Sequence, residues 1–229
     1  MSQNEWRLIR TGKSDGYFNM ALDEAILDSV FSDRSVSTLR FYGWENPIIS
    51  IGYLQKIKGI RNFLNERADL VRRITGGGIV YHDLDLSFSI TVKDSFVNSL
   101  GVHESYNIIS KAVANGLIKS GIKAEVYTDH SEKLPECFPC PQKYDIVSNK
   151  SKIYGAAQRR IKDTLLHQGT VKNISKAATC RRTIEAALEN SLSACFGIIF
   201  KKGDLLESEK ELAIILKKKY ESTAWKNWY

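Results

Sequence analysis

The sequence has no long apolar run and few cysteines. No stretch approaches the roughly 20 consecutive apolar residues that cross a bilayer, and the N-terminal segment from Met1 to Trp6 lacks the basic and apolar regions of a signal peptide. Four cysteines in 229 residues are too few for a disulfide framework, so reduced thiols are expected. These absences favour a cytoplasmic protein over a membrane-spanning or disulfide-stapled one.

Proline is also scarce, and it is concentrated in one segment. Three of the four prolines fall within residues 135–141, where they exclude a regular helix or a central strand, so a constrained surface loop is predicted. This loop contains Cys137 and Cys140. No second Cys or His pair stands at zinc spacing, which disfavours a metal site, and the flanking prolines disfavour a redox dithiol. A thiolate nucleophile and a pair of ordinary loop cysteines remain the two interpretations.

The charge balance favours acidic partners without choosing among them. Lysine and arginine number 33 against 26 acidic residues, which gives a net charge of +7. Nucleic acid, phosphorylated metabolites and acidic carrier proteins all fit such a charge. The basic residues are spread along the chain and do not cluster with aromatics, so a dedicated nucleic-acid binder is disfavoured.

The most informative stretch is a glycine loop, Gly76-Gly77-Gly78, which follows Arg72 and Arg73 and precedes His82. Consecutive glycines between strand-like residues indicate that something approaches the main chain closely. Freed backbone amides beside two guanidinium groups suit a carboxylate, a phosphate or the polar head of an acyl compound. A glycine-rich bulge or hairpin turn, with His82 as a structural imidazole, is the alternative.

A second candidate site surrounds Lys152, which precedes the small residues Gly155, Ala156 and Ala157. Small side chains on a strand leave room for a ligand, and Lys152 together with the two arginines would form a basic pocket able to activate a thiolate. A solvated hairpin lysine is the alternative. His167 lies in a further strand, where it is open to a purely structural role.

Hydrophobic periodicity predicts the elements of an α+β protein. Helices are predicted at residues 18–31, 60–67, 104–120 and 183–193, and from Ser208, which forms a capping box with Glu211. The first helix is expected to be amphipathic and to lie on the sheet. Strands 38–42 and 48–53 are expected to pair antiparallel, and residues 148–151 to form a hairpin turn. Cys180 and Cys195 are predicted to lie in the core, and the tail at 220–229 to pack.

Residues 72–83 resemble the signature loop of the lipoate-protein ligase and octanoyltransferase family, which is related more distantly to biotin ligases. Other stretches agree with the family in the same order, namely residues 16–24, 39–44, 50–55, 152–158 and 166–170. The resemblance implies an α+β fold with a mixed, largely antiparallel sheet and packed helices. It also implies a single catalytic domain over residues 1–229 without a separate C-terminal accessory domain.

Family members attach an octanoyl or lipoyl group to one lysine of a lipoyl domain, such as those of 2-oxo acid dehydrogenases or the glycine cleavage H protein. The resemblance implies that Lys152 holds the acyl carbonyl or a phosphate oxygen and that no cofactor is bound permanently. It assigns the acyl or adenylate pocket to the following residues: Arg72, Arg73, Thr75, Gly76, Gly77, Gly78, His82, Gly155, Ala156, His167 and Gly169.

Two chemistries compete within this family. A transferase takes octanoate from acyl carrier protein onto a cysteine, and the segment 137–145 resembles two versions of that motif, which select Cys137 or, alternatively, Cys140. A ligase activates free lipoate with ATP and Mg. The sequence departs from common patterns of the family at Gly78, in the His167-Gln168-Gly169 order and in the residues after Asp83. The cysteine route is slightly favoured. A non-catalytic basic protein that binds a ligand or nucleic acid is the alternative of another class.

Overall fold

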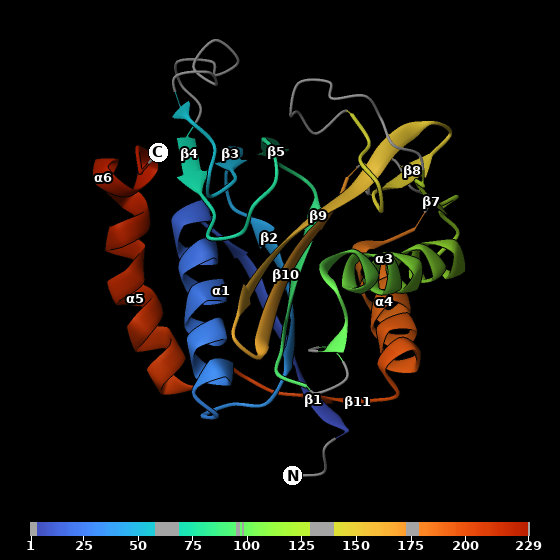
Figure 1. Cartoon of the computed structure of the whole chain (residues 1–229), viewed down its shortest axis with the longest axis horizontal. Coiled ribbons are helices and arrows are strands. Elements are labelled where there is room, and N and C mark those ends of the chain that lie inside the picture. Colours follow the sequence, from blue (N-terminus) through green and yellow to red (C-terminus); the bar gives the residue numbers. More distant parts are fainter. Residues whose placement is uncertain are drawn as a thin grey trace.

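The computed structural model describes residues 4–57, 69–94, 97, 99–128, 140–172 and 179–228. Within them the chain forms two sheets, and helices cover both faces of the larger one (Figure 1). The larger sheet runs in the order β11 (Ile199–Lys202), β1 (Glu5–Ser14), β2 (Thr38–Trp44), β6 (Leu86–Val92), β10 (Thr164–Val171), β9 (Ser151–Ile161), β8 (Ile146–Ser148) and β7 (Glu125–Val126). The smaller sheet runs in the order β4 (Asp69–Arg72), β3 (Ile48–Ile51) and β5 (Val80–His82).

Antiparallel pairing dominates the described part of the larger sheet, as the family resemblance implied. Strands β2, β6, β10, β9, β8 and β7 are antiparallel to their neighbours along this series, whereas β1 pairs in parallel with β2 and β11. The predicted hairpin turn between β8 and β9 is present. Asn149 and Lys150 have φ angles of 48° and 66°, which suit a two-residue turn between twisted strands.

Strand β3 does not pair with β2, so the predicted antiparallel pair is wrong. It pairs in parallel with β4 and antiparallel with β5. The reason is that β1 and β6 occupy both edges of β2, which leaves no edge for a further strand. Strands β4 and β5 enter and leave the glycine loop, so β3 lies at the centre of the sheet that frames this loop.

The first helix, α1 (Gly16–Phe31), is present as predicted but is not amphipathic. It lies between the larger sheet and α5 (Glu207–Glu221), and apolar residues such as Met20, Ala21 and Leu27 are buried in the core formed there. Because α5 covers its outer side, this helix needs few polar residues. It begins where the Asp15 side chain accepts a hydrogen bond from the Phe18 amide at 3.0 Å.

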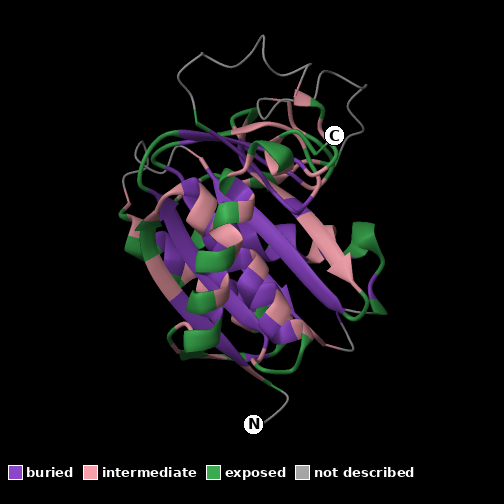
Figure 2. Ribbon diagram, turned by 90° about the vertical axis from the view of Figure 1, so that its left-hand side faces the viewer, coloured by how far each residue is buried: buried purple, intermediate pink, exposed green. Residues whose placement is uncertain are grey.

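The opposite face of the sheet is covered by α3 (Val102–Lys119) and α4 (Arg181–Phe196), which pack against each other over a second apolar cluster. Figure 2 shows the strands between the two helical layers as largely buried. Cys180 and Cys195, predicted to lie in the core, are exposed at the start and in the last turn of α4. The helix predicted at residues 60–67 falls outside the described residues. None of the described helices is long and apolar enough to span a membrane.

Helix α5 begins at Glu207, one residue before the predicted capping box of Ser208 and Glu211. The Glu209 carboxylate accepts a hydrogen bond from the Leu206 amide at 2.9 Å and forms an ion pair with Arg7 at 2.6 Å. A contact with a distant strand therefore fixes the start of this helix. The short helix α6 (Thr223–Lys226) follows α5 and packs beside β4, which confirms that the described part of the tail is packed.

Candidate functional site

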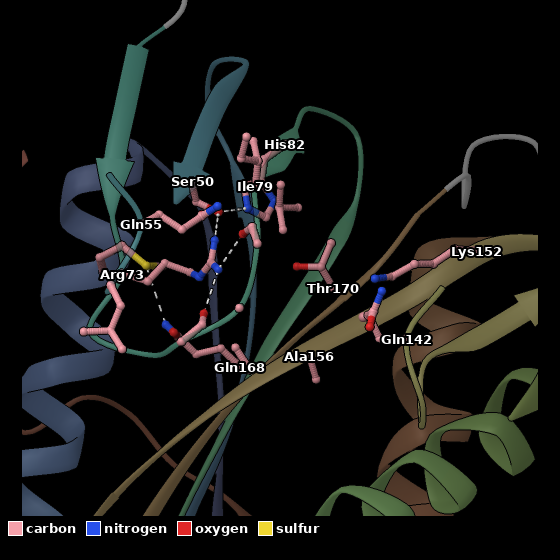
Figure 3. Close-up of a pocket in the computed structure, with 18 of the residues that line it drawn as sticks. Ser50, Gln55, Arg73, Ile79, His82, Gln142, Lys152, Ala156, Gln168 and Thr170 are labelled. Carbon is pink, nitrogen blue, oxygen red and sulfur yellow. Dashed lines mark hydrogen bonds between the residues drawn. The ribbon is translucent and has the colours of Figure 1, made fainter. Parts of the chain in front are cut away.

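A cavity of about 570 Å³ lies between the glycine loop and strands β9 and β10 (Figure 3). Gly76, Gly77 and Gly78 line it on one side, and Lys152 and Gly155 line it on the other. In the close-up, Lys152 and Gln142 lie at one end of the site and Arg73, Ser50 and Gln168 lie toward the other, with Ala156 and Thr170 between them. The two features singled out in the sequence therefore share one cavity.

The glycine loop is held against the end of β3. The Tyr53 amide donates to the Thr75 carbonyl oxygen at 2.8 Å, and a Cβ atom at Gly52 would collide with the Gly77 carbonyl. Gly77 itself has φ +86°, a conformation that residues with a Cβ rarely adopt. Two of these glycines are thus required by geometry, Gly52 for close packing and Gly77 for its backbone conformation.

Arg73 lies inside the loop and shapes it. Its Nη1 donates to Ser50 Oγ at 2.6 Å, and its Nη2 donates to the carbonyl oxygens of Gly76 and Gly78, both at 2.9 Å. Only 6% of this residue is exposed, and burial lowers the pKa of the guanidinium to about 10. At neutral pH the group is therefore a buried cation whose bonds go largely to the protein.

His82 is buried between a carboxylate and a hydroxyl. Its Nδ1 lies 2.7 Å from Asp85 Oδ2, and its Nε2 lies 2.7 Å from Ser50 Oγ. Burial lowers the pKa of His82 to about 4, and Asp85 opposes this shift. Burial would raise the pKa of Asp85, but the His82 bond and the Lys172 charge lower it to about 2. The neutral imidazole therefore donates from Nδ1 to an ionised carboxylate and accepts at Nε2 from Ser50.

Lys152 is oriented by Asp145 at the other end of the cavity. The two charges lie 2.7 Å apart, and the same carboxylate oxygen accepts a hydrogen bond from the Gln142 amide at 2.6 Å. Burial raises the pKa of Asp145, while the neighbouring ammonium opposes that rise. Asp145 thus ties the lysine to the segment that follows Cys140.

The small residues of β9 leave the space that the sequence suggested. Gly155 pairs with Thr170 and Ala157 pairs with Gln168, and these residues line the cavity together with Ala156. A Cβ at Gly155 would lie 2.7 Å from Lys152 Cε and 2.9 Å from its Nζ. The glycine is needed because the lysine side chain lies across it.

Arg72, which the resemblance placed in the acyl pocket, does not line this cavity. Its guanidinium donates to the carbonyl oxygens of Gly52, Tyr53, Trp225 and Lys226 at 2.7–3.1 Å and is fully buried. The second residue of the Arg-Arg pair, Arg73, thus faces the cavity, and the first joins the loop to the C-terminal helix α6.

Three other residues that the resemblance placed in the acyl pocket lie behind the wall of this cavity. Thr75 Oγ1 donates to Gln168 Oε1 at 2.7 Å. His167 is buried against the Tyr154 hydroxyl at 2.8 Å, and burial lowers its pKa to about 3. A Cβ at Gly169 would lie 2.7–2.8 Å from the rings of Tyr154 and Phe88. These residues support the lining without forming it.

The structure describes one of the two candidate cysteines. Cys140 lines the cavity, whereas Cys137 falls outside the described residues. The lining therefore includes a thiol from the proline-rich segment.

Sequence reasoning missed several residues that line or hold this site. Ser50, Trp44, Met20 and Gln168 line the cavity, and Asp85 holds His82. Ser50 and Trp44 fall within stretches that match the family motifs, but a single serine or tryptophan in a strand carries no signal of its own. Their partners come from other strands, so only the tertiary structure reveals the contacts.

Solved structures with this architecture define the class of protein. Protein Ta0514 of T. acidophilum, assigned as a lipoate protein ligase, superposes with a TM-score of 0.83 at 27% identity, covering 98% of this chain and 100% of the other. A lipoate-protein ligase A bound with ATP superposes with a TM-score of 0.79 at 26% identity, covering 96% and 98%. The fold is that of a lipoate ligase catalytic domain.

The sequence agrees with this class. The family model of the lipoyl protein ligase A/B catalytic domain matches residues 15–190, and the chain belongs to this family. It is 30% identical to octanoyltransferase LipM of Kyrpidia tusciae, covering 96% of this chain and 97% of the relative, and 29% identical to octanoyltransferase LipM of Clostridioides difficile over the same shares. The family resemblance and the α+β fold are confirmed, and the chain is an enzyme of the acyltransferase and ligase kind.

Proposed function

We propose that this enzyme transfers an octanoyl group from a thioester to a lysine of a lipoyl domain by way of one of its own cysteines. Relatives named octanoyltransferases over nearly the whole chain support the reaction. The observation that carries the proposal is the shared lining of one cavity by the glycine loop, Lys152 and Cys140. This arrangement supports the proposal because the Lys152 ammonium, the proposed oxyanion stabiliser, lies beside the same cavity as the cysteine-containing segment.

In the first step, a cysteine thiolate attacks the carbonyl carbon of the thioester and a new carbon–sulfur bond forms. The carbonyl oxygen becomes an oxyanion, which the Lys152 ammonium, oriented by Asp145, stabilises. The carrier thiolate then leaves and takes up a proton. We assign the attack to Cys137, which matches the transferase motif, with Cys140 as the alternative. The position of Cys140 supports the approach of this segment to the acyl group.

In the second step, the amine of the acceptor lysine attacks the acyl-enzyme. The enzyme thiolate leaves, the amine loses a proton, and an amide is formed. Lys152 stabilises the second oxyanion in the same position as the first, so a single fixed ammonium serves both steps.

Acyl carrier protein is the proposed donor, and lipoyl domains of 2-oxo acid dehydrogenases or of the glycine cleavage H protein are the proposed acceptors. A net charge of +7 favours the approach of acidic domains, because electrostatic attraction raises association rates. Both encounters should therefore weaken as salt increases.

An ATP-dependent ligase reaction is the competing chemistry, because a structural neighbour at 26% identity is bound with ATP. The cations among the described lining residues are Arg73 and Lys152, and each already bonds to protein groups. A triphosphate would need further positive charge, such as that of bound Mg, whereas a neutral thioester would not. The described part of the cavity therefore favours the thioester as the substrate.

Reconstitution tests the two chemistries directly. The purified chain is incubated with a lipoyl domain and either octanoyl-acyl carrier protein without ATP or octanoate with ATP and Mg, and modification of the lipoyl lysine is followed by mass spectrometry. The proposal expects modification in the first mixture. Modification confined to the second mixture, with pyrophosphate release that survives loss of both Cys137 and Cys140, would establish the ligase reaction instead.

A further inference from the structure

A continuous chain of hydrogen bonds runs through the wall of the cavity to the glycine loop. It passes from Asp85 to His82 at 2.7 Å, from His82 to Ser50 at 2.7 Å, and from Ser50 to Arg73 at 2.6 Å. Arg73 then donates to two carbonyl oxygens of the loop. We call the side chains of Asp85, His82, Ser50 and Arg73 the relay, and Figure 3 shows the bonds from His82 onward.

The relay is buried throughout, so each of its bonds is made away from water. Exposure is 3% at Asp85, 3% at His82, 0% at Ser50 and 6% at Arg73. A buried polar group that loses its partner costs more than the net gain from making the bond. The four side chains therefore hold one another in a single arrangement.

The relay has a defined direction. The ionised Asp85 fixes the imidazole tautomer, so His82 Nε2 accepts the Ser50 hydrogen. This leaves Ser50 Oγ as an acceptor for Arg73, and the measured 2.6 Å distance matches that bond. The serine can hold the guanidinium only while its own hydrogen points toward the histidine.

Arg73 transmits this arrangement to the loop. Its planar guanidinium draws the carbonyl oxygens of Gly76 and Gly78 to one nitrogen, and Gly77 lies between them with φ +86°. With both carbonyl oxygens bound to a cation, neither is free to repel the oxygen of an acyl group in the cavity. A lysine in this position would lack the rigid fork that bridges Ser50 and the loop.

The geometry of Asp85, His82 and Ser50 also matches that of a nucleophilic serine with its base. A nucleophile needs an open approach to its oxygen, but Ser50 Oγ lies between His82 and the Arg73 guanidinium and is fully buried. The cavity is also lined by the thiol of Cys140, from the proline-rich segment, and by the Lys152 ammonium, so another nucleophile is present there. These contacts favour a positioning role over a nucleophilic one.

We propose that His82, Asp85 and Ser50 are positioning residues that set the conformation of the glycine loop through Arg73 and thereby the affinity for the acyl donor. This inference rests on the proposed octanoyl transfer for its kinetic consequence. It does not rest on that reaction for its structural consequence, which is the order of the loop itself.

Two histidine variants separate positioning from acid–base catalysis. His82→Gln retains an oxygen that can accept from Ser50, whereas His82→Leu does not. We expect His82→Leu to raise KM for octanoyl-acyl carrier protein about tenfold, the effect of losing about one well-placed hydrogen bond, and His82→Gln to recover most of the loss. If kcat instead falls to the same low value in both variants, His82 acts as a base and the proposal is overturned.

Serine variants provide the matched comparison. Ser50→Ala should raise KM about as much as His82→Leu, and the double variant should be no worse than either single variant, because both break the same relay. Ser120→Ala is the control, since Ser120 is also buried and donates one hydrogen bond, to Leu117, far from the cavity. An octanoyl group found on Ser50, or a Ser50→Ala variant that matches the control, would contradict the proposal.

Hydrogen exchange tests the relay even if the enzyme uses another chemistry. Backbone amides of residues 74–80 should exchange faster in Ser50→Ala and His82→Leu than in Ser120→Ala, with His82→Gln close to the parent protein. Unchanged exchange in this segment would overturn the inference. An absence of acyl transfer by the parent protein would instead contradict the proposed function.

Discussion

The amine of Lys152 lies across Gly155, so that a Cβ atom at position 155 would fall 2.9 Å from Nζ. Residue 155 therefore controls where the ammonium of residue 152 can lie. Asp145 holds the amine from the other side at 2.7 Å. The lysine has one position in the cavity because the carboxylate attracts it there and the missing side chain leaves it room.

Gly155→Ala should displace Lys152 and slow acyl transfer. We expect kcat to fall at least about tenfold and the free energy of unfolding to fall by about 1–3 kcal/mol, the usual cost of overpacking. Gly101→Ala is the control, because a Cβ there meets no atom within 4 Å. The destabilisation should shrink in a Lys152→Ala background, where the clash is absent. An equal loss in both backgrounds, measured by denaturant unfolding, would show that the lysine is not the group displaced.

Asp145→Asn should uncouple Lys152 from the segment after Cys140. The amide keeps an oxygen that can accept from Gln142 but loses the charge that attracts the ammonium. We expect a lower rate of acyl-enzyme formation in single-turnover experiments with little change in donor binding. Asp69→Asn, on the exposed first residue of β4, is the control. A variant that acylates at the parent rate would remove Asp145 from the mechanism.

Arg72→Lys should loosen the C-terminal helix α6 more than it perturbs the cavity. Lysine has fewer donors and no planar fork, so buried and partly buried carbonyl oxygens at residues 52–53 and 225–226 would lose their partners. We expect a loss of at least about 2 kcal/mol in stability. Arg34→Lys, which alters an exposed ion pair with Asp28, should cost about 0.5 kcal/mol or less. Equal stability of the two variants would contradict the tethering role of Arg72.

Stability should decrease as the pH falls below about 6.5. Burial lowers the pKa of His82 to about 4 and that of His167 to about 3, so the unfolded chain binds these protons first. For each histidine, the free energy of unfolding then falls by up to about 1.4 kcal/mol per pH unit as the pH drops from its unfolded to its folded pKa. Asp85 behaves as a lowered carboxyl, and its contribution is lost as the pH falls from about 4 toward 2. His167→Gln should flatten this profile.

The family resemblance was sufficient to predict that the glycine loop and Lys152 share one pocket, whereas the residue types alone left a solvated lysine as the alternative. The relay was not predictable, because it is assembled by strand pairing. Strand β3 brings Ser50 beside β5, where Ile48 pairs with His82, and this pairing conflicts with the hairpin that local sequence favours. The local signal failed since both edges of β2 were already occupied.

Two neighbouring arginines of one motif likewise have different positions that the sequence alone does not distinguish. Arg72 and Arg73 are equivalent in the sequence, but alternate residues of an extended chain point to opposite sides. Arg73 consequently faces the cavity, and Arg72 faces the C-terminal segment. Helix α1 was predicted to be amphipathic for a similar reason. Its outer side is apolar because α5, which is distant in the sequence, covers it.

The covalent state of the enzyme tests the central claim most directly. Intact-mass and peptide analysis after incubation with octanoyl-acyl carrier protein, without an acceptor, should show one octanoyl group that Cys137→Ser abolishes and Cys140→Ser retains. An enzyme that stays unmodified under these conditions while it still octanoylates a lipoyl domain would contradict the cysteine route.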